Sequence, residues 1–188
     1  MFGLPGDTGM AFYDALYHEP AITHVMTRDE RSASFMADVY ARVSYRLGIC
    51  EGPSGGGATY SVPGVAEAHG SAVPVLCLTS DTPVSQQHWN VLTELDQVAL
   101  FRPVTGWTER VLAADSMDDA LRRAIRMAIS GRPGASHLSM PEDSLENDVL
   151  ERVARQSDER LTDRFPLSRP RADRAEVDRS ARLLVEAE

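Results

Sequence analysis

Apolar runs typical of buried strands alternate with helical segments along most of the chain. The clearest run is VPVLCLT at 73–79, which is continuous and bounded by turn residues. YRLGIC at 45–50 and ASHLSMP at 135–141 read as further strands. Strands separated by helices pair in parallel, because a parallel pair needs a long crossover connection. The sequence therefore predicts an α/β fold: three α/β/α layers around a largely parallel sheet.

Helices are predicted at 10–20, 29–46 and 116–131, the last with a capping box at Ser116 and Asp119 and a stop at Gly131. In the second helix, Phe35, Met36, Val39, Tyr40 and Val43 repeat at helical spacing. The third has one apolar face, made of Met117, Ala120, Leu121, Ala124, Ile125, Ala128 and Ile129. Met26, Met36 and Met127 are expected in the core.

The segment CEGPSGGGATY at 50–60 holds four glycines between a predicted strand and a predicted helix. In open α/β sheets, ligands bind outside the carboxyl ends of strands, and glycine lets them approach backbone N–H groups. We therefore favour a binding loop over a merely tight turn. Neither the G-x-x-x-x-G-K-[ST] nor the G-x-G-x-x-G spacing fits.

Composition narrows the class of protein. A net charge of −9 without a basic cluster argues against a nucleic-acid partner. The sequence has no apolar run of 18 residues and no signal-peptide pattern, which predicts a cytoplasmic protein without a membrane span. Cys50 and Cys77 fall in predicted strands and are expected to be buried free thiols. No Cys/His spacing suggests a metal site.

Two acids, Asp29 and Glu30, follow a short strand predicted at 22–26 and open the second helix. They can be acids that complement the positive end of the helix macrodipole. They can also be carboxylates at the carboxyl edge of the sheet, beside the glycine-rich loop. The histidines are scattered, and none forms a nucleophile–base–acid order with a serine: His18, His24, His69, His88 and His137.

Five separated motifs occur in a familiar order: FGLPGD, RDERSASFMADVYAR, PSGGGATYSVPGVAEAHGSAVPVLCLTSD, LTELDQVALFRPVTGW and GRPGASHLSMPED. Together they resemble the N-terminal pyrimidine-binding domain of thiamine diphosphate-dependent enzymes. The superfamily includes acetolactate synthase, benzoylformate decarboxylase and oxalyl-CoA decarboxylase. The resemblance covers residues 1 to about 145 and implies the thiamine diphosphate-binding fold.

The resemblance implies a catalytic role for Glu30. It aligns with the family's glutamate, which hydrogen-bonds the aminopyrimidine ring nitrogen N1′ and favours the imino tautomer that deprotonates thiazolium C2. Further cofactor-binding positions follow from the turn after the first strand and from the glycine-rich loop: Pro5, Gly6, Ser54, Gly55, Gly57 and Thr59. The same matching assigns Asp7 and Thr93 to the substrate cleft.

Several positions depart from the family's pattern. The histidine before the glutamate is Asp29, the loop proline is Gly56, and the loop asparagine is Tyr60. A glutamine that lines the acetolactate synthase site is replaced by Thr93. These departures leave the cofactor assignment standing and leave the substrate open within the 2-keto acids.

The family's G-D-G…N motif, which holds magnesium and the diphosphate, does not occur in this sequence. We therefore expect a pyrimidine-binding domain at 1–145, a linker at 146–172, and the start of a truncated central domain at 173–188. The resemblance implies a diphosphate-binding domain as partner, from the same or another chain, a homo-oligomer, and a chain that is inactive alone. A non-catalytic or regulatory module and one subunit of a split enzyme are the alternatives.

Overall fold

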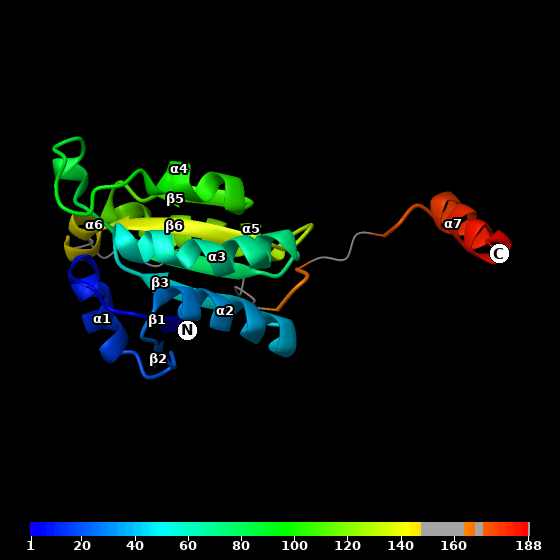
Figure 1. Cartoon of the computed structure of the whole chain (residues 1–188), viewed down its shortest axis with the longest axis horizontal. Coiled ribbons are helices and arrows are strands. Elements are labelled where there is room, and N and C mark those ends of the chain that lie inside the picture. Colours follow the sequence, from blue (N-terminus) through cyan, green and yellow to red (C-terminus); the bar gives the residue numbers. More distant parts are fainter. Residues whose placement is uncertain (148–163, 168–170, 188) are drawn as a thin grey trace.

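The computed structural model describes residues 1–147, 164–167 and 171–187 (Figure 1). Within these residues, six parallel strands form one sheet in the order β2-β1-β3-β4-β6-β5. The strands are β1 (Phe2–Gly3), β2 (Val25–Met26), β3 (Gly48–Gly52), β4 (Val75–Asp81), β5 (Trp107–Arg110) and β6 (Ala135–Pro141). The predicted parallel α/β architecture is confirmed, and β5 is a strand that the sequence did not reveal.

The centre of the sheet is buried on both sides. Every residue of β4 and β6 is buried, and Cys50, Cys77 and His137 lie in register across β3, β4 and β6. Strands covered on both faces favour apolar side chains, which explains the continuous apolar run at 73–79 in β4. Both cysteines are buried and free, as predicted.

Helices cover both faces of the sheet (Figure 1). On one side, α2 (Glu30–Ser44), α3 (Gly56–Gly70) and α4 (Gln97–Phe101) enclose a core rich in alanine and valine. On the other, α1 (Met10–Tyr17), α5 (Met117–Ile129) and α6 (Glu142–Glu146) enclose a core of larger aliphatic side chains. Short 3₁₀ turns follow β1 and β4 and flank β5: η1 (Asp7–Gly9), η2 (Val84–Gln86), η3 (Arg102–Val104) and η4 (Ala114–Ser116).

The large apolar residues of α2 suggest that they form its buried face. In the structure the helix instead packs against the rest of the domain with its opposite face. Its buried residues are small or acidic, namely Glu30, Ala33, Ser34, Ala37, Asp38 and Ala41. The large residues are exposed by 37% to 73%: Phe35, Met36, Val39, Tyr40 and Val43. Alanine lets the helix lie close to β3, where a Cβ on Gly48 would sit 2.1 Å from the Ala37 carbonyl oxygen. Met26, Met36 and Met127 are likewise exposed, so the prediction that they belong to the core is wrong.

Helix α5 follows its prediction except at its start. Its alanines and Ile129 are buried, and Met117, Leu121 and Ile125 pack partly buried against the same core. The predicted capping box is wrong, because Ser116 makes no side-chain cap and its hydroxyl donates to the Ala113 carbonyl at 2.7 Å. Ser116 has helical dihedral angles at the end of η4, so its side chain cannot reach the orphan N–H groups of α5.

The C-terminal part contains α7 (Arg174–Glu186), which has no buried residue. The Asp173 side chain caps it by accepting from the N–H groups of Ala175 and Glu176. Most of the linker predicted at 146–172 lies outside the described residues. In the described part of the chain, no helix is both long and apolar enough to cross a bilayer.

Candidate functional site

The order of the strands creates a switch point between β1 and β3. From β1 the chain continues outward to β2, whereas from β3 it continues in the opposite direction to β4. Connections that leave neighbouring parallel strands toward opposite faces open a space outside their carboxyl ends, where ligands of α/β proteins bind. The residues there are the turn at 4–9 and the loop at 53–55. We call these two segments, with the ends of β1 and β3, the switch-point edge.

Glu30 reaches this edge from the first turn of α2. It is 7% exposed. A Cβ on Gly57 would lie 3.1 Å from the Glu30 Oε1, and a Cβ on Gly52 would lie 3.2 Å from its Cγ. Among the described residues, no group donates a hydrogen bond to the Glu30 carboxylate. The neighbouring Asp29 carboxylate, in contrast, accepts hydrogen bonds from the backbone N–H groups of Arg31 and Ser32. A shielded carboxylate with free lone pairs is suited to bind a nitrogen base.

The glycine-rich segment is shorter as a loop than the sequence suggests, because Gly56 and Gly57 already belong to α3. Gly55 precedes the helix with φ of +62°, a region that glycine adopts without strain. The segment therefore presents the amino end of a 15-residue helix at the switch-point edge. Its N–H groups and the positive end of the helix dipole face this edge.

A chain of hydroxyl groups joins the elements of the edge. Thr8 lies 2.8 Å from the Ser80 Oγ and donates to the Ser54 Oγ at 3.2 Å. The Ser54 Oγ is in turn 2.7 Å from the Thr93 Oγ1. The turn after β1, the loop after β3, the end of β4 and the loop before α4 are thus held together by side-chain hydrogen bonds.

The structure brings most of the proposed site residues together and leaves some at the rim. Gly6 lies against the glycine-rich segment, since a Cβ on it would be 2.5 Å from the Pro53 Cβ. Ser54, Gly55 and Thr93 are in mutual contact. The side chains of Pro5, Asp7 and Thr59 are exposed, and Thr59 donates to the Gly56 carbonyl at 2.7 Å.

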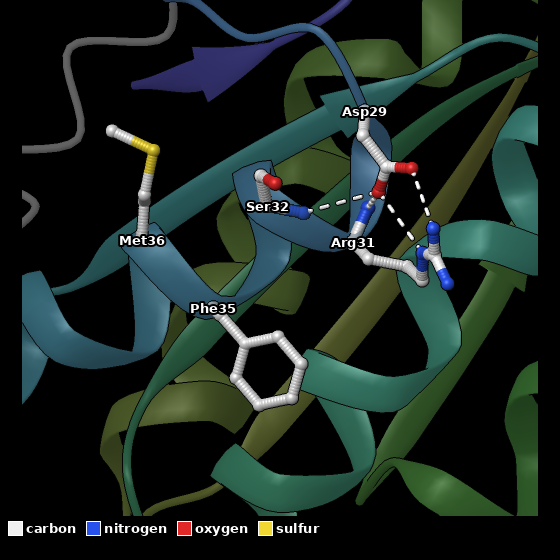
Figure 2. Close-up of a pocket in the computed structure, with 5 residues that line it drawn as sticks. All are labelled: Asp29, Arg31, Ser32, Phe35 and Met36. Carbon is white, nitrogen blue, oxygen red and sulfur yellow. Dashed lines mark hydrogen bonds and ion pairs between the residues drawn. The ribbon is translucent and has the colours of Figure 1, made fainter.

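Two departures from the family's pattern are in contact through Arg31. The Asp29 carboxylate caps α2 and pairs with the Arg31 guanidinium at 2.9 Å, which lowers the Asp29 pKa to about 2. The same guanidinium lies 5.6 Å from the centre of the Tyr60 ring. Figure 2 shows the Asp29 carboxylate turned toward Arg31 and the Ser32 N–H. Asp29 is therefore a helix cap, in agreement with one of the two interpretations of these acids.

A shallow depression lies next to this ion pair, lined by Asp29, Arg31, Ser32, Phe35 and Met36 (Figure 2). Glu30 does not line it. The depression therefore belongs to the exposed face of α2.

One buried acid at the edge was missed in the sequence. Glu51, on β3, is 1% exposed and accepts a hydrogen bond from the Tyr13 hydroxyl. Burial first, and then the charge of Glu30, raise the pKa of Glu51 to about 7, whereas the Tyr13 hydrogen bond acts in the opposite direction. Burial first, and then the hydrogen bond to Glu51 and the charges of Glu51 and Glu30, raise the pKa of Tyr13. An acid inside a strand that is otherwise apolar was the available signal.

The edge fits a thiamine-type ligand on its own geometry. It offers a shielded carboxylate without a donor, glycines where a Cβ would fill the space beside it, and the amino end of α3. Among the described residues, no group of three or more His, Cys, Asp or Glu side chains could hold a metal ion.

Comparison with known proteins agrees with this geometry. Residues 1–100 match the family model described as "Thiamine pyrophosphate enzyme, N-terminal TPP binding domain". A probable acetolactate synthase large subunit of Methanococcus aeolicus is 38% identical over 151 residues, which is 79% of this chain and 25% of that protein. Acetolactate synthase isozyme 3 large subunit of Escherichia coli K12 is 34% identical over 145 residues, 77% of this chain and 25% of that protein.

A glyoxylate carboligase of Escherichia coli O157:H7 is similar along the whole chain, with 28% identity over 188 residues and 31% of that protein covered. The chain thus spans about a quarter to a third of the length of these relatives. The similarity extends through the sheet, the switch-point edge and its helices. The chain therefore belongs to the thiamine pyrophosphate enzymes and carries their N-terminal thiamine pyrophosphate-binding domain.

Proposed function

We propose that this chain supplies the pyrimidine-binding half of a thiamine diphosphate site. The enzyme would be of the 2-keto acid decarboxylase, synthase or lyase type. The relatives that support this class are named as acetolactate synthases and a glyoxylate carboligase. The remaining half, which holds the diphosphate and Mg²⁺, would come from a diphosphate-binding domain of the same or another chain.

The observation that carries the proposal is the placement of Glu30. It is a nearly buried carboxylate at the carboxyl edge of a parallel sheet, packed against Gly52 and Gly57. When bound, thiamine diphosphate supplies a nucleophilic carbon and an electron sink. Glu30 would hold a proton between its carboxylate and the ring nitrogen N1′ of the aminopyrimidine, and the glycines would let the ring approach.

Other residues of the edge would shape the pocket. Gly6, Ser54 and Gly55 would contact the pyrimidine through backbone and small side chains, with Pro5, Gly57 and Thr59 beside them. Thr93 and Asp7 would face a 2-keto acid substrate at the rim. The hydroxyl chain from Thr8 to Thr93 would keep these segments in register, because each hydrogen bond joins two different loops.

The exposed face of α2 supports an assembly. Five large apolar side chains lie together on a helix whose opposite face is packed: Phe35, Met36, Val39, Tyr40 and Val43. Contiguous apolar patches of this kind mark protein–protein contacts. We propose that a diphosphate-binding domain or a second subunit covers this face, in a homo-oligomer located in the cytoplasm.

Mass measurement of the polypeptide from the source cell first establishes the native length of the protein. The test is then calorimetric titration of thiamine diphosphate and Mg²⁺ into the protein of that length. Glu30→Gln removes the carboxylate but keeps its shape. It is expected to weaken binding at least tenfold and to abolish turnover. Glu142→Gln, which removes a charge from α6, is the matched control and should bind like the wild type.

Equal binding by Glu30→Gln and the wild type would contradict the proposed role of Glu30. A wild-type protein of native length that does not bind the cofactor alone would instead favour a subunit that needs a separate diphosphate-binding chain. Binding without turnover in every assembly would favour a regulatory module.

A further inference from the structure

The second acid at the switch-point edge, Glu51, approaches it from the other face of the sheet. Successive residues of a strand point to opposite faces, so Glu51 points toward α1, whereas Gly52 points toward α3 and Glu30. Glu51 lies on β3 directly before Gly52, whose Cβ position is 3.2 Å from the Glu30 Cγ. The two acids therefore flank the end of β3 from both sides.

The space around the Glu51 carboxyl group is made by two glycines. A Cβ on Gly3 would lie 2.6 Å from the Glu51 Oε2, and a Cβ on Gly9 would lie 3.7 Å from its Oε1. Gly3 ends β1 and Gly9 ends the η1 turn, so both belong to the segment that approaches the ligand site. A side chain at Gly3 would require the acid to move, which ties its position to the backbone of the switch-point edge.

The polar and titratable neighbours of Glu51 come from several elements. Tyr13 of α1 donates its hydroxyl to Glu51, and the His24 Nε2 lies 3.3 Å from the same hydroxyl. Glu30 of α2 acts on Glu51 by its charge, and Glu51 acts on Cys77 of β4 in the same way. Ser80 of β4 lies 3.4 Å from the Gly9 Cβ position. Among the described residues, the charged side chain that acts on Glu51 is thus another acid.

We propose that Glu51 and Glu30 form an asymmetric carboxyl pair, in which Glu51, the more deeply buried acid, keeps its proton up to neutral pH beside the Glu30 side chain. The assignment follows from their surroundings: Glu51 is more deeply buried and its partner is a phenol, whereas Glu30 faces the ligand side. Environments that differ in this way separate the protonation states of two neighbouring acids. Glu51 is a positioning residue, because it acts on the ligand through the charge it adds beside Glu30.

The effect of Glu51 on ligand binding rests on the proposed function, whereas the carboxyl pair is a property of the protein without any ligand. Ionisation of Glu51 above neutral pH would add a second negative charge near the site of a cationic ring system. The result would be tighter binding of thiamine compounds at pH 8 than at pH 6, by roughly two- to tenfold for charges several ångströms apart.

The pair is tested by carboxyl carbon NMR of the whole protein with labelled glutamate. Glu51 is expected to titrate near neutral pH in the wild type, and Glu51→Gln identifies its signal by removing it. Glu30→Gln is expected to lower the Glu51 midpoint by roughly half to one pH unit. Glu142→Gln, the matched control, should leave the midpoint in place. A Glu51 midpoint near 4.5, or one that Glu30→Gln does not move, would overturn the pair.

The ligand effect is tested by calorimetry with thiamine, which carries the two rings without the diphosphate, at pH 6 and pH 8. Glutamine resembles a protonated glutamate and does not ionise. The thiamine affinity of Glu51→Gln should therefore not show the increase from pH 6 to pH 8 that is expected for the wild type. The same pH dependence in both proteins would overturn the positioning role. If the wild-type protein does not bind thiamine, the positioning role fails, whereas the proposed function is decided by the titration of thiamine diphosphate and Mg²⁺ and the carboxyl pair by the NMR titration.

Discussion

His137 is a neutral imidazole in the centre of the sheet. Its ring stacks on Phe101 at 3.8 Å between centroids, and its nitrogens lie 2.7 Å from the hydroxyl groups of Thr79 and Thr108. The ring is fully buried, and this burial lowers the pKa of His137 from 6.5 to about 3. Two hydroxyl partners satisfy both ring nitrogens of a neutral imidazole, whereas a charged ring would be costly at this position.

Burial of His137 as a neutral ring should make the protein less stable in acid. Below pH 6.5 the unfolded chain protonates this histidine, whereas the folded protein does so only near pH 3, so the free energy of unfolding falls as pH falls between these values. From pH 7 to pH 5 this residue alone should remove about 2 kcal/mol. Urea unfolding of the wild type and of His137→Gln at pH 7 and pH 5 measures this contribution. It is the difference between the two proteins in how much unfolding free energy each loses from pH 7 to pH 5.

His18→Gln serves as the control, because His18 is exposed. It should leave the pH dependence of unfolding close to that of the wild type. If His137→Gln loses as much stability as the wild type between pH 7 and pH 5, the buried imidazole is not the group responsible.

Glu51 gives a prediction of opposite sign. Its pKa is raised from 4.5 to about 7, so folding takes up a proton between these values and the free energy of unfolding falls as pH rises through this window. Glu51→Gln, which stays neutral, should therefore be more stable than the wild type at pH 8 by about 2–3 kcal/mol, with a smaller difference at pH 4. Urea unfolding at both pH values decides this, and a constant difference would contradict it.

Among the elements, α2 and α3 pack closely against each other. A Cβ on Gly64 of α3 would lie 2.4 Å from the Ser34 Oγ and 2.6 Å from the Phe35 backbone nitrogen. The Ser34 side chain is also held in place, because its hydroxyl donates a hydrogen bond to the Arg31 carbonyl at 2.9 Å. Small residues on both helices thus allow an approach that a methyl group would block.

Gly64→Ala is accordingly expected to destabilise the protein by about 1–3 kcal/mol, because the two helices must move apart. Gly70→Ala is the matched control on the same helix, where a Cβ would meet nothing within 4 Å. It should be neutral or slightly stabilising, since alanine favours the helical state. Thermal unfolding of both variants makes the comparison, and equal melting temperatures would show that the contact can relax without cost.

At the scale of the whole molecule, the outward face of α2 is apolar and partly exposed. We expect Val39→Lys/Val43→Lys to keep the unfolding free energy of the wild type within about 0.5 kcal/mol, because both side chains are more than half exposed. The same variant should weaken self-association or association with a diphosphate-binding domain. Sedimentation velocity over a range of protein concentrations measures this, and Leu112→Lys, an exposed residue before η4, is the control.

Loss of folding in the double lysine variant would mean that this face stabilises the single chain. Unchanged association in a folded variant would mean that the contact lies elsewhere. Either result would remove α2 as the proposed interface.

The sequence by itself determined the alternation of strands and helices, except for β5 and the short helices α4 and α6. The continuous apolar run at 73–79 identified β4, because strands covered on both faces favour apolar side chains, and the segment at 135–141 identified β6 although it contains serine and histidine. The motif order also led to Glu30 and to the glycine-rich segment. Both signals are local in the chain, so they could be read without knowing which elements touch.

Only the tertiary structure decided which face of each element is buried and which side chains meet. The large residues of α2 suggested a core face, yet close approach to β3 and α3 favours its alanines. Glu51 lies in a strand where its charge looks out of place, and the space left by Gly3 and Gly9, distant in the sequence, accommodates it. Burial and proximity to Glu30 then set its protonation, since both depend on distances between segments that the order of residues does not specify.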